Sequence, residues 1–312
     1  MIVNSDFSVY ELSINVRVTW QGHSLSNAGN NGSIRLLPRR QLLADGTETD
    51  ACSGNIAKHY NAMLLAELME EADIPLCLAC AARDGRRAAA LIGLEDYKDM
   101  TIERVLQGCG LCDTHGLLVT AKNAASDGST QTRQRLSKHS LLEFSFALAL
   151  PHQYSETVHL LTRMGDSKDD GQMLLKTPAR SGTYAFNLRY KPAGIGMDTD
   201  KWAIVLTDQK QRLQRYRATL YSLRDQILSP SGALTSTMLP QLTGLMGVIV
   251  IRTHAGRAPI YSALDDSFIS YLTALESDTC RVFSFEKIDE FAKHMNDLIQ
   301  TSYPYLPQIR KI

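Results

Sequence analysis

Four cysteines arranged as two close pairs are the residues in this sequence best suited to bind a metal ion. Cys77 and Cys80 form one C-x-x-C pair, and Cys109 and Cys112 form a second. A two-residue gap lets both thiolates of a pair turn toward the same tetrahedral ion. Residues 81–108 separate the pairs by more than the usual zinc-ribbon spacing. The pattern nevertheless predicts a structural zinc ion held by four protein ligands.

The cysteines also allow two alternative roles. The four thiols could be reduced and partly buried as small apolar side chains, or His115 could replace one of them as a ligand. Redox chemistry is disfavoured because neither pair is expected at a strand-to-helix junction. Cys52 and Cys280 are unpaired in the sequence pattern, so we expect them in the interior.

A long polar segment from Gly22 to Thr49 carries the second set of chemically interesting residues. Arginine side chains and small polar donors suit the sugar-phosphate backbone of a nucleic acid. A segment of this length without a periodic pattern is either functional or a mobile surface loop. The backbone contacts that we predict from this segment are His23, Ser24, Asn27, Arg35, Arg39 and Arg40.

The residues after this segment open a helix that reaches about Met69. Ser53 is a suitable N-cap, and the apolar residues Ile56, Tyr60, Met63, Leu64 and Leu68 recur at helical spacing. The free N–H groups of a first helical turn suit an anion such as phosphate. We therefore add Ser53, Asn55, Lys58 and His59 to the predicted nucleic-acid contacts.

No catalytic motif accompanies these residues. The sequence contains no GxSxG, P-loop, HExxH or dinucleotide-binding pattern. The histidines at 23, 59 and 139 suit the role of hydrogen-bonding or core residues better than that of general bases. We therefore predict no catalytic residues and a protein that is not an enzyme.

Two groups of aspartates could bind a metal ion and would then speak against this prediction. Asp166, Asp169 and Asp170 could bind a divalent cation, but they are typical of a solvated loop tip. Asp45 and Asp50 could activate a water molecule together with a metal ion, yet nothing nearby in the sequence completes such a site.

Charge and hydropathy limit the class of protein. The formal net charge is zero and the pI is about 7.1, which argues against a simple basic DNA-binding domain. A nucleic-acid site must then be a local basic stripe. No stretch is long and apolar enough for a membrane span, and the N-terminus lacks a signal-peptide pattern. We expect a cytoplasmic protein with reduced thiols and no membrane partner.

The elements that would position these residues follow from periodicity. Strict alternation over Tyr10–Trp20 predicts a strand with one buried and one wet face. Further strands are predicted at 142–150, ended by Pro151, at 183–190 and at Val248–Ile251, and helices at 53–69, 208–228 and 286–298. The order β-α-β-β-α-β is typical of an α+β, ferredoxin-like (RRM-like) fold. Its polar face, with Ser13, Asn15 and Arg17, would serve a ligand or inserted loops.

Two segments interrupt this core. Residues 74–140 hold the cysteine pairs and have the character of an insertion, and residues 152–182 are predicted to form a protruding hairpin. The polar tail of the insertion supplies Lys138, and the hairpin supplies Lys176 and Arg180, as further contacts. Met164 and Met173 flank the hairpin tip, where each could wedge between bases or simply fill core space.

Four pieces of sequence carry a resemblance to a known family. They are His23–Gly29 with Pro38-Arg39-Arg40, Asp50–His59 at the helix start, Ser181–Arg189 with Ile195-Gly196, and the late Gly-Val-Ile-Val strand. In these pieces the sequence resembles the Cas-seven backbone subunits of type I CRISPR effector (Cascade) complexes, in particular the DevR group. None is a tight motif alone, but their order spans most of the chain.

The resemblance implies a shape like a right hand. The palm would comprise residues 1–73 and 141–312, the fingers 74–140, and the thumb the hairpin at about 155–180. Members of the family stack as copies along CRISPR RNA, kink the guide with their thumbs and present its bases to target DNA beside other Cascade subunits. The commonest members lack the zinc pairs, although some relatives carry zinc in the fingers.

Two alternatives remain beside this non-catalytic RNA-binding subunit. Related type III backbone subunits cut target RNA with a loop aspartate, so a metal-dependent ribonuclease using an aspartate of the 45–50 loop is one. A zinc-stabilised RNA-binding protein that acts alone is the other.

Overall fold

The computed structural model describes residues 6–31, 35–91, 100–122, 133–163, 173–308. Four long strands form the centre of the fold: β2 (Glu11–His23), β10 (Ala147–Arg163), β11 (Met173–Tyr190) and β14 (Gln241–Arg252). The shorter strands are β1 (Phe7–Val9), β3 (Asn27–Asn31), β4 (Arg35–Pro38), β5 (Arg40–Leu42), β6 (Glu48–Cys52), β9 (Leu142–Phe144), β12 (Met197–Asp198), β13 (Ala203–Ile204), β15 (Cys280–Phe285) and β16 (Ser302–Pro304).

One large sheet organises these strands. Its order is β15-β14-β2-β11-β10-β6-β5, and the neighbouring strands along this path are antiparallel. Strand β9 adds to β11, and the β3–β4 ribbon joins β11 through a parallel contact of β4. The expectation of a fold that mixes helices and strands is confirmed.

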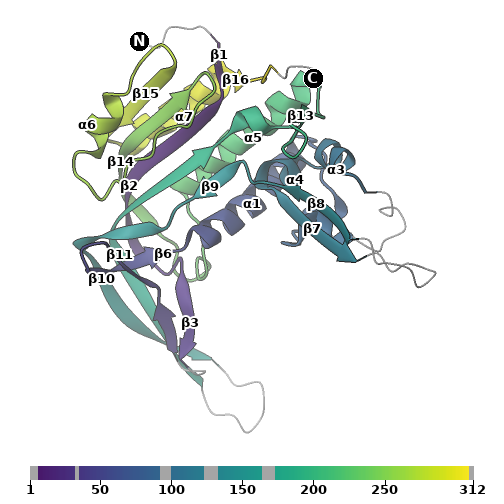
Figure 1. Cartoon of the computed structure of the whole chain (residues 1–312). Coiled ribbons are helices and arrows are strands. Elements are labelled where there is room, and N and C mark those ends of the chain that lie inside the picture. The colour runs from purple at the N-terminus through teal and green to yellow at the C-terminus, as the bar shows by residue number, and fades with distance from the viewer. Residues whose placement is uncertain (1–5, 32–34, 92–99, 123–132, 164–172, 309–312) are drawn as a thin grey trace.

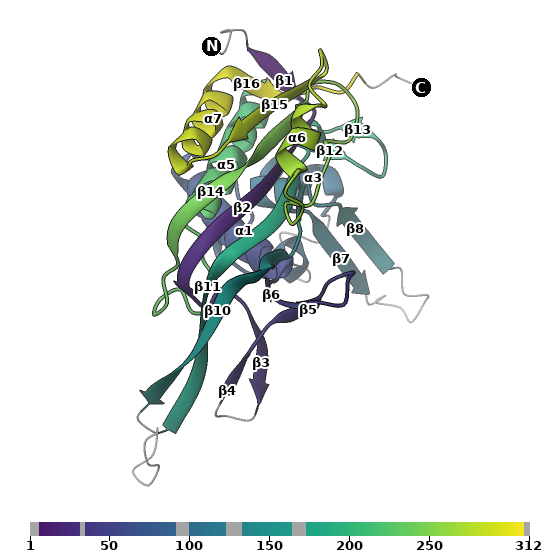
Figure 2. The same ribbon diagram turned by 90° about the vertical axis from the view of Figure 1, so that its left-hand side faces the viewer.

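Three helices cover one face of this sheet. They are α1 (Gly54–Glu71), α5 (Gln209–Leu228) and α7 (Ile288–Thr301), and Figure 2 shows them behind the sheet with α6 (Phe268–Thr273) in front. The apolar face of β2, including Ile14, Val16 and Val18, packs against α5 and α7 in the main core. The predicted helices begin at 53 and 208, one residue before the observed starts of α1 and α5. In each helix this residue, Ser53 or Asp208, is the N-cap whose side chain accepts from the first turn.

The polar face of β2 is not wet, which corrects the expectation from alternation. Glu11, Ser13 and Asn15 are buried beneath residues 258–268, which cross this face before and within α6. Ser13 Oγ donates to Pro259 O at 2.5 Å, and Asn15 Oδ1 accepts from the backbone N–H of Tyr261 at 3.2 Å. An inserted segment thus occupies the face that was expected to serve a ligand or inserted loops.

Two further expectations fail because backbone pairing extends beyond the patterned residues. The segment from Gly22 to Thr49 is not structureless, since it forms β3, β4, β5 and the start of β6. Pro151 does not end its strand either. Instead β10 continues to Arg163, with the register shifting between Ala149 and Tyr154, where an irregular stretch accommodates the proline.

Residues 74–140 surround a second core beside α1 (Figure 1). Their described elements are α2 (Leu78–Ala81), the 3-10 helix η1 (Arg87–Leu91), α3 (Ile102–Gly108), α4 (Gly110–His115), β7 (Leu117–Lys122) and β8 (Arg133–Lys138). A further 3-10 helix, η3 (Pro192–Gly194), follows β11. Leu65 and Met69 of α1 and Ala218 of α5 belong to this second core, so the insertion packs on both helices.

The predicted hairpin is present as the extended ends of β10 and β11, which pair from Tyr154 with Gly182 to Arg163 with Met173. Figure 1 shows it projecting below the sheet with β3 beside it. Among the described residues, no helix combines the length and the apolarity that crossing a membrane requires.

Candidate nucleic-acid interface and metal centre

The sulfur atoms of Cys77, Cys80, Cys109 and Cys112 all lie within 4.8 Å of one another. Cys77 Sγ and Cys80 Sγ are 3.9 Å and 3.6 Å from Cys112 Sγ. A tetrahedral zinc ion with Zn–S bonds of about 2.3 Å separates its sulfur ligands by about 3.8 Å. The donor set therefore fits a zinc ion in both chemistry and spacing.

Two short helices position these sulfurs. Cys77 precedes α2 and Cys80 lies within it, while Cys109 precedes α4 and Cys112 lies within it. In the second pair, the Cys109 sulfur accepts the backbone N–H of Cys112 at 3.4 Å. Hydrogen bonding among the thiols, from Cys109 first, lowers the pKa of Cys77 and raises the pKa of Cys80 and Cys112. Zinc binds the thiolate form, so loading the site would displace the protons that these two thiols hold.

His115 lies outside this sulfur cluster. Its Nε2 is 2.9 Å from Oδ1 of Asn61 in α1, and burial lowers the pKa of the imidazole well below its usual value. His115 thus joins α4 to α1 as a neutral core residue. Cys52 is also interior, and burial raises the pKa of its thiol to about 12.

Arg180 and His23, both predicted to contact nucleic acid, are instead buried at the base of the hairpin. Arg180 donates to Asp50 Oδ1 at 3.1 Å and to Ser26 O at 2.7 Å, and the Tyr184 hydroxyl donates to Asp50 Oδ2 at 2.7 Å. The His23 ring packs edge-on against Tyr184. Burial, with the Arg180 charge, lowers the pKa of His23 to about 3.

The predicted nucleic-acid contacts of Ser24 and Lys138 are also wrong, because both side chains are buried. Ser24 is buried, with its hydroxyl donating to Asn27 Oδ1 at 3.3 Å. Lys138 is buried in an ion pair with Asp113, which Arg215 also contacts at 2.8 Å. Burial alone would raise the pKa of Asp113, but the charges of Lys138 and Arg215 outweigh it and the pKa is lowered. This network ties α4 and β8 to α5.

The arginines of the 22–49 segment attach it to its neighbours. Arg39 donates to Ser26 Oγ at 3.2 Å and to Asn27 O at 3.0 Å. Arg40 pairs with Glu156 of β10 at 2.5 Å and donates to the Tyr154 hydroxyl at 3.0 Å. Both guanidinium groups thus have protein partners.

Three further predicted contacts, Arg35, Lys176 and Met173, lie on β4 and β11. Arg35 of β4 pairs through its backbone with Lys176 of β11, whose side chain is exposed. Met173 begins β11. Met164 lies outside the described residues, as do Asp166, Asp169 and Asp170.

The start of α1 is capped as expected, but strand β9 covers part of it. Ser53 Oγ accepts the backbone N–H of Asn55 at 3.2 Å. A Cβ atom on Gly54 would lie 2.5 Å from Phe144 O and 2.8 Å from Ser145 O, so only glycine allows this approach. Asn55 and His59 remain exposed and Lys58 is half-buried. Burial, and then the Arg87 charge, lowers the pKa of Lys58.

Asn55 and Lys58 line two hollows beside α1. One, of about 200 Å³, also contains His59, Arg83 and Arg87. The other is a groove of about 870 Å³ between α1, β9 and the segment after β11. Its basic and aromatic lining residues are Lys58, His139, Phe144, Arg189, Lys191, Trp202 and Arg257, and its acidic lining residues are Glu11, Glu143 and Asp200.

Sequence reasoning missed Arg189, Lys191, Trp202 and Arg257 as groove residues. The basic pair Arg189 and Lys191 stands in a stretch without acidic residues, a signal that pointed to them. Arg257 immediately precedes the segment that crosses the sheet, and no local pattern links it to the start of α1. Glu143 accepts from Arg189 at 2.8 Å and lies 3.8 Å from Arg257.

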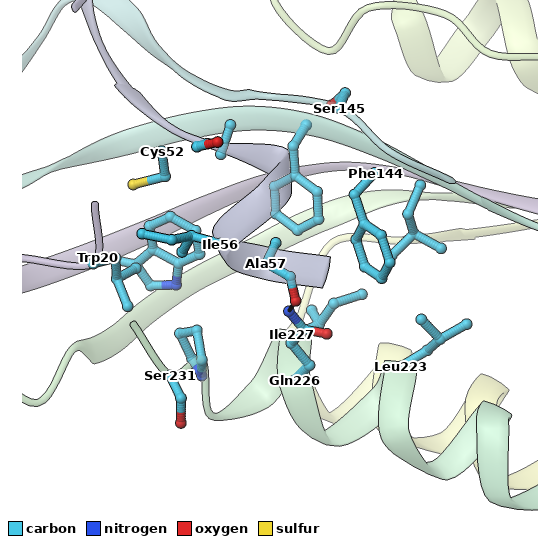
Figure 3. A pocket seen from close by; sticks show the side chains of 16 residues that line it. Trp20, Cys52, Ile56, Ala57, Phe144, Ser145, Leu223, Gln226, Ile227 and Ser231 are labelled. Carbon is cyan, nitrogen blue, oxygen red and sulfur yellow. Dashed lines mark hydrogen bonds between the residues drawn. The ribbon is translucent and has the colours of Figure 1, made fainter. Parts of the chain in front are cut away.

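A separate apolar pocket of about 60 Å³ lies between the starts of α1 and β10 and the end of α5. Figure 3 shows Trp20, Ile56, Phe144 and Ile227 around it, with Gln226 donating to Ala57 O at 2.6 Å. Because this pocket is small and lined mainly by apolar side chains, we interpret it as a packing gap in the core rather than a nucleic-acid site.

Comparisons with known proteins complete these observations. A family model described as "CRISPR-associated negative auto-regulator DevR/Csa2" matches residues 14–270. Two solved structures, titled "CRISPR RNA-guided surveillance complex, pre-nicking" and "CRISPR RNA-guided surveillance complex", are similar to this chain at 11% identity and a TM-score of 0.47. The similarity covers 93% of this chain and 99% and 98% of theirs. Curated proteins give no match.

Proposed function

The chain belongs to the CRISPR-associated DevR/Csa2 family, and from this premise we propose that it is a non-catalytic backbone subunit of a type I CRISPR-Cas surveillance complex. In this role it holds CRISPR RNA by the sugar-phosphate backbone without sequence preference. It packs against further copies of itself and other Cascade subunits, and it presents guide bases to target DNA. We also infer a ferredoxin-like (RRM-like) palm from the sheet order β14-β2-β11-β10 with α1 and α5 on one face.

The observation that supports RNA binding most directly is the groove beside α1. Lys58 lines it from the first turns of the helix, next to the exposed Asn55. Among the described residues, Lys58 has no ion-pair partner within 4.0 Å, unlike the buried Arg180 and Lys138. A cation that lacks a protein partner is available to a phosphate oxygen.

Purification of the full chain tests this function. We expect RNA to copurify with the protein and Lys58→Ala to reduce the amount retained severalfold. Lys293→Ala on α7 is the matched control, because Lys293 is exposed on a helix remote from the groove. Equal RNA retention by all three proteins would refute the groove as the RNA site. Absence of RNA from the unmodified protein and from its complexes would refute the function.

The absence of catalysis is tested on the assembled complex. Within the described part of the chain, the cysteines are the only group of at least three potential metal ligands. Asp50 is held by Arg180 and Tyr184, so it is engaged in the fold rather than free to bind a cation. We expect no cleavage of complementary RNA in the presence of magnesium. Regularly spaced cuts would favour the ribonuclease alternative.

We further infer that a structural zinc ion occupies the cysteine cluster. Four sulfur ligands leave no open coordination position, so the ion would stabilise the fold around α2 and α4. Purified protein should contain about one zinc ion per chain, and Cys112→Ser should lose it. Cys280→Ser changes a buried cysteine outside the cluster and should retain it. Equal zinc content in both variants would contradict the assignment.

A further inference from the structure

Trp202 is the most unusual side chain at the groove beside α1. Its side chain is 64% exposed, although tryptophan is usually mostly buried. Its backbone has a φ of +51°, which is uncommon for a bulky residue and marks local strain. A strained backbone that presents a large aromatic ring to solvent is characteristic of functional sites.

The turn that carries Trp202 is firmly anchored. It joins β12 to β13, and the buried Asp198 accepts the backbone N–H groups of Asp200 at 2.9 Å and Lys201 at 3.3 Å. Lys201 also pairs with Glu103 of α3 at 2.6 Å. These contacts hold the backbone that carries the ring, so little backbone conformational entropy is lost there when a ligand binds.

Charged residues of both signs line the groove beside the ring, with Glu11, Glu143 and Asp200 among them. Lys58, Lys191 and His139 line the same groove, and Lys191 and Arg257 lie on the stretches that follow β11 and β14. The acidic lining residues have protein partners: Arg189 contacts Glu143 at 2.8 Å and Glu11 at 3.4 Å, and Asp200 accepts from the Ser137 hydroxyl at 3.3 Å. An aromatic platform beside cations that can track a phosphate backbone is the combination by which proteins bind single-stranded nucleic acid.

We propose that Trp202 is a stacking platform for an unpaired nucleobase of single-stranded nucleic acid lying in the groove. This inference rests on the proposed RNA-binding function and adds a base contact to it. The stacking is independent of sequence, because every base has a π-face. An apolar protein partner fits the site less well, because it would cover the charged side chains of Lys58 and Lys191 without giving them a partner.

Intrinsic fluorescence provides a direct test, because the chain contains only two tryptophans and Trp20 is buried. Full-length protein stripped of nucleic acid at high salt is titrated with a labelled oligoribonucleotide. An abasic ribose-phosphate of equal length and a single-stranded DNA of the same sequence are titrated in parallel. We expect the base-bearing strand to quench fluorescence and the abasic strand not to. The preference between RNA and DNA distinguishes a guide base from a target base.

Two variants separate stacking from other roles of the ring. Trp202→Phe retains an aromatic face, so it should bind within about threefold of the unmodified protein but lose the quenching. Trp202→Ala should weaken binding by about fivefold or more, with an unchanged melting temperature. The quenching of the unmodified protein needs no variant, so it tests the proposal even if a variant fails to fold.

The outcomes distinguish this proposal from the proposed function. RNA binding that is measured by anisotropy, without quenching and with equal affinity for the abasic strand, would overturn stacking while leaving RNA binding intact. No binding of any strand would overturn both. A fluorescence change that depends on protein concentration alone would place Trp202 at a contact between copies and would also overturn the proposal.

Discussion

At the scale of single residues, two buried aspartates in the interior of this protein form ion pairs with buried basic side chains. Asp50 receives the Arg180 guanidinium and the Tyr184 hydroxyl, and Asp113 receives Lys138 and Arg215. Burying an ion pair is not by itself strongly stabilising, but removing one partner leaves an uncompensated charge. These residues therefore act mainly by joining elements.

Replacing Asp50 tests this role. Asp50→Ala should lower the free energy of unfolding by about 3–5 kcal/mol, because Arg180 would stay buried without its carboxylate. Chemical unfolding followed by circular dichroism measures the change. Asp45→Ala, in an exposed turn of the same segment, is the control and should change stability far less, because no buried charge loses its partner. A loss no larger for Asp50→Ala than for this control would contradict the role.

His23 makes a pH-dependent contribution to stability. The folded protein keeps the imidazole neutral down to about pH 3, whereas the unfolded chain binds a proton below about pH 6.5. The contribution is therefore fully present above pH 6.5 and is lost as the pH falls toward 3. Between pH 7 and pH 5 the loss should be about 2 kcal/mol.

The matched experiment compares unfolding of His23→Asn with the unmodified protein at both pH values. The variant should lose about 2 kcal/mol less over this range, whereas His254→Asn, at an exposed position, should behave like the unmodified protein. Because burial also lowers the pKa of His115, some acid sensitivity should remain. Identical pH profiles for all three proteins would exclude the effect.

At the scale of elements, the start of α1 depends on how closely β9 approaches it. Helix α1 begins at Gly54 behind the Ser53 cap, and the carbonyl groups of Phe144 and Ser145 occupy the space that a side chain at position 54 would need. The same first turns line the groove that we assign to RNA. The contact of helix and strand thus sets the position of Asn55 and Lys58.

Adding one methyl group tests this approach. Gly54→Ala should destabilise the protein by about 1–3 kcal/mol, because backbone atoms rather than flexible side chains must move. Gly85→Ala is the control, since a Cβ atom there would have no neighbour within 4 Å. Thermal unfolding should give a lower melting temperature for Gly54→Ala than for Gly85→Ala. Equal melting temperatures would show that the backbone of β9 can move away from position 54 at little energetic cost.

At the scale of the whole molecule, the formal net charge is zero, so the positive charge that can attract RNA must be concentrated in one part of the surface. Much of its positive charge is neutralised inside the fold or in surface ion pairs, as for Arg180, Arg215 and Arg83. The groove beside α1 keeps Lys58 and Lys191 on its wall. RNA binding by one copy should therefore involve few phosphates and depend on copies acting together.

The salt dependence of binding measures this number. For single-stranded RNA, each phosphate contact adds about 0.7 to the slope of log affinity against log salt concentration. Lys58→Ala should reduce the slope by about this amount, and Lys293→Ala should leave it unchanged. A slope that is unaffected by Lys58→Ala would remove this lysine from the RNA contacts.

The sequence by itself determined the elements whose patterns are local. Alternation predicted β2, capping and apolar spacing predicted α1 and α5, and two C-x-x-C pairs predicted one sulfur cluster, which is confirmed. Motifs in order along the chain indicated the DevR group, and the family model confirms it. Each of these signals lies within a few residues or in simple chain order, so one sequence suffices to read it.

Only the tertiary structure decided which polar residues face a ligand. Arg180 meets Asp50 across 130 positions of sequence, and residues beyond 255 cover the polar face of β2. Lys138 and His23 are buried for the same reason, while Trp202 and Arg257 reach the groove from segments with no pattern of their own. Burial and charge pairing depend on neighbours that are remote along the chain, and periodicity carries no information about them.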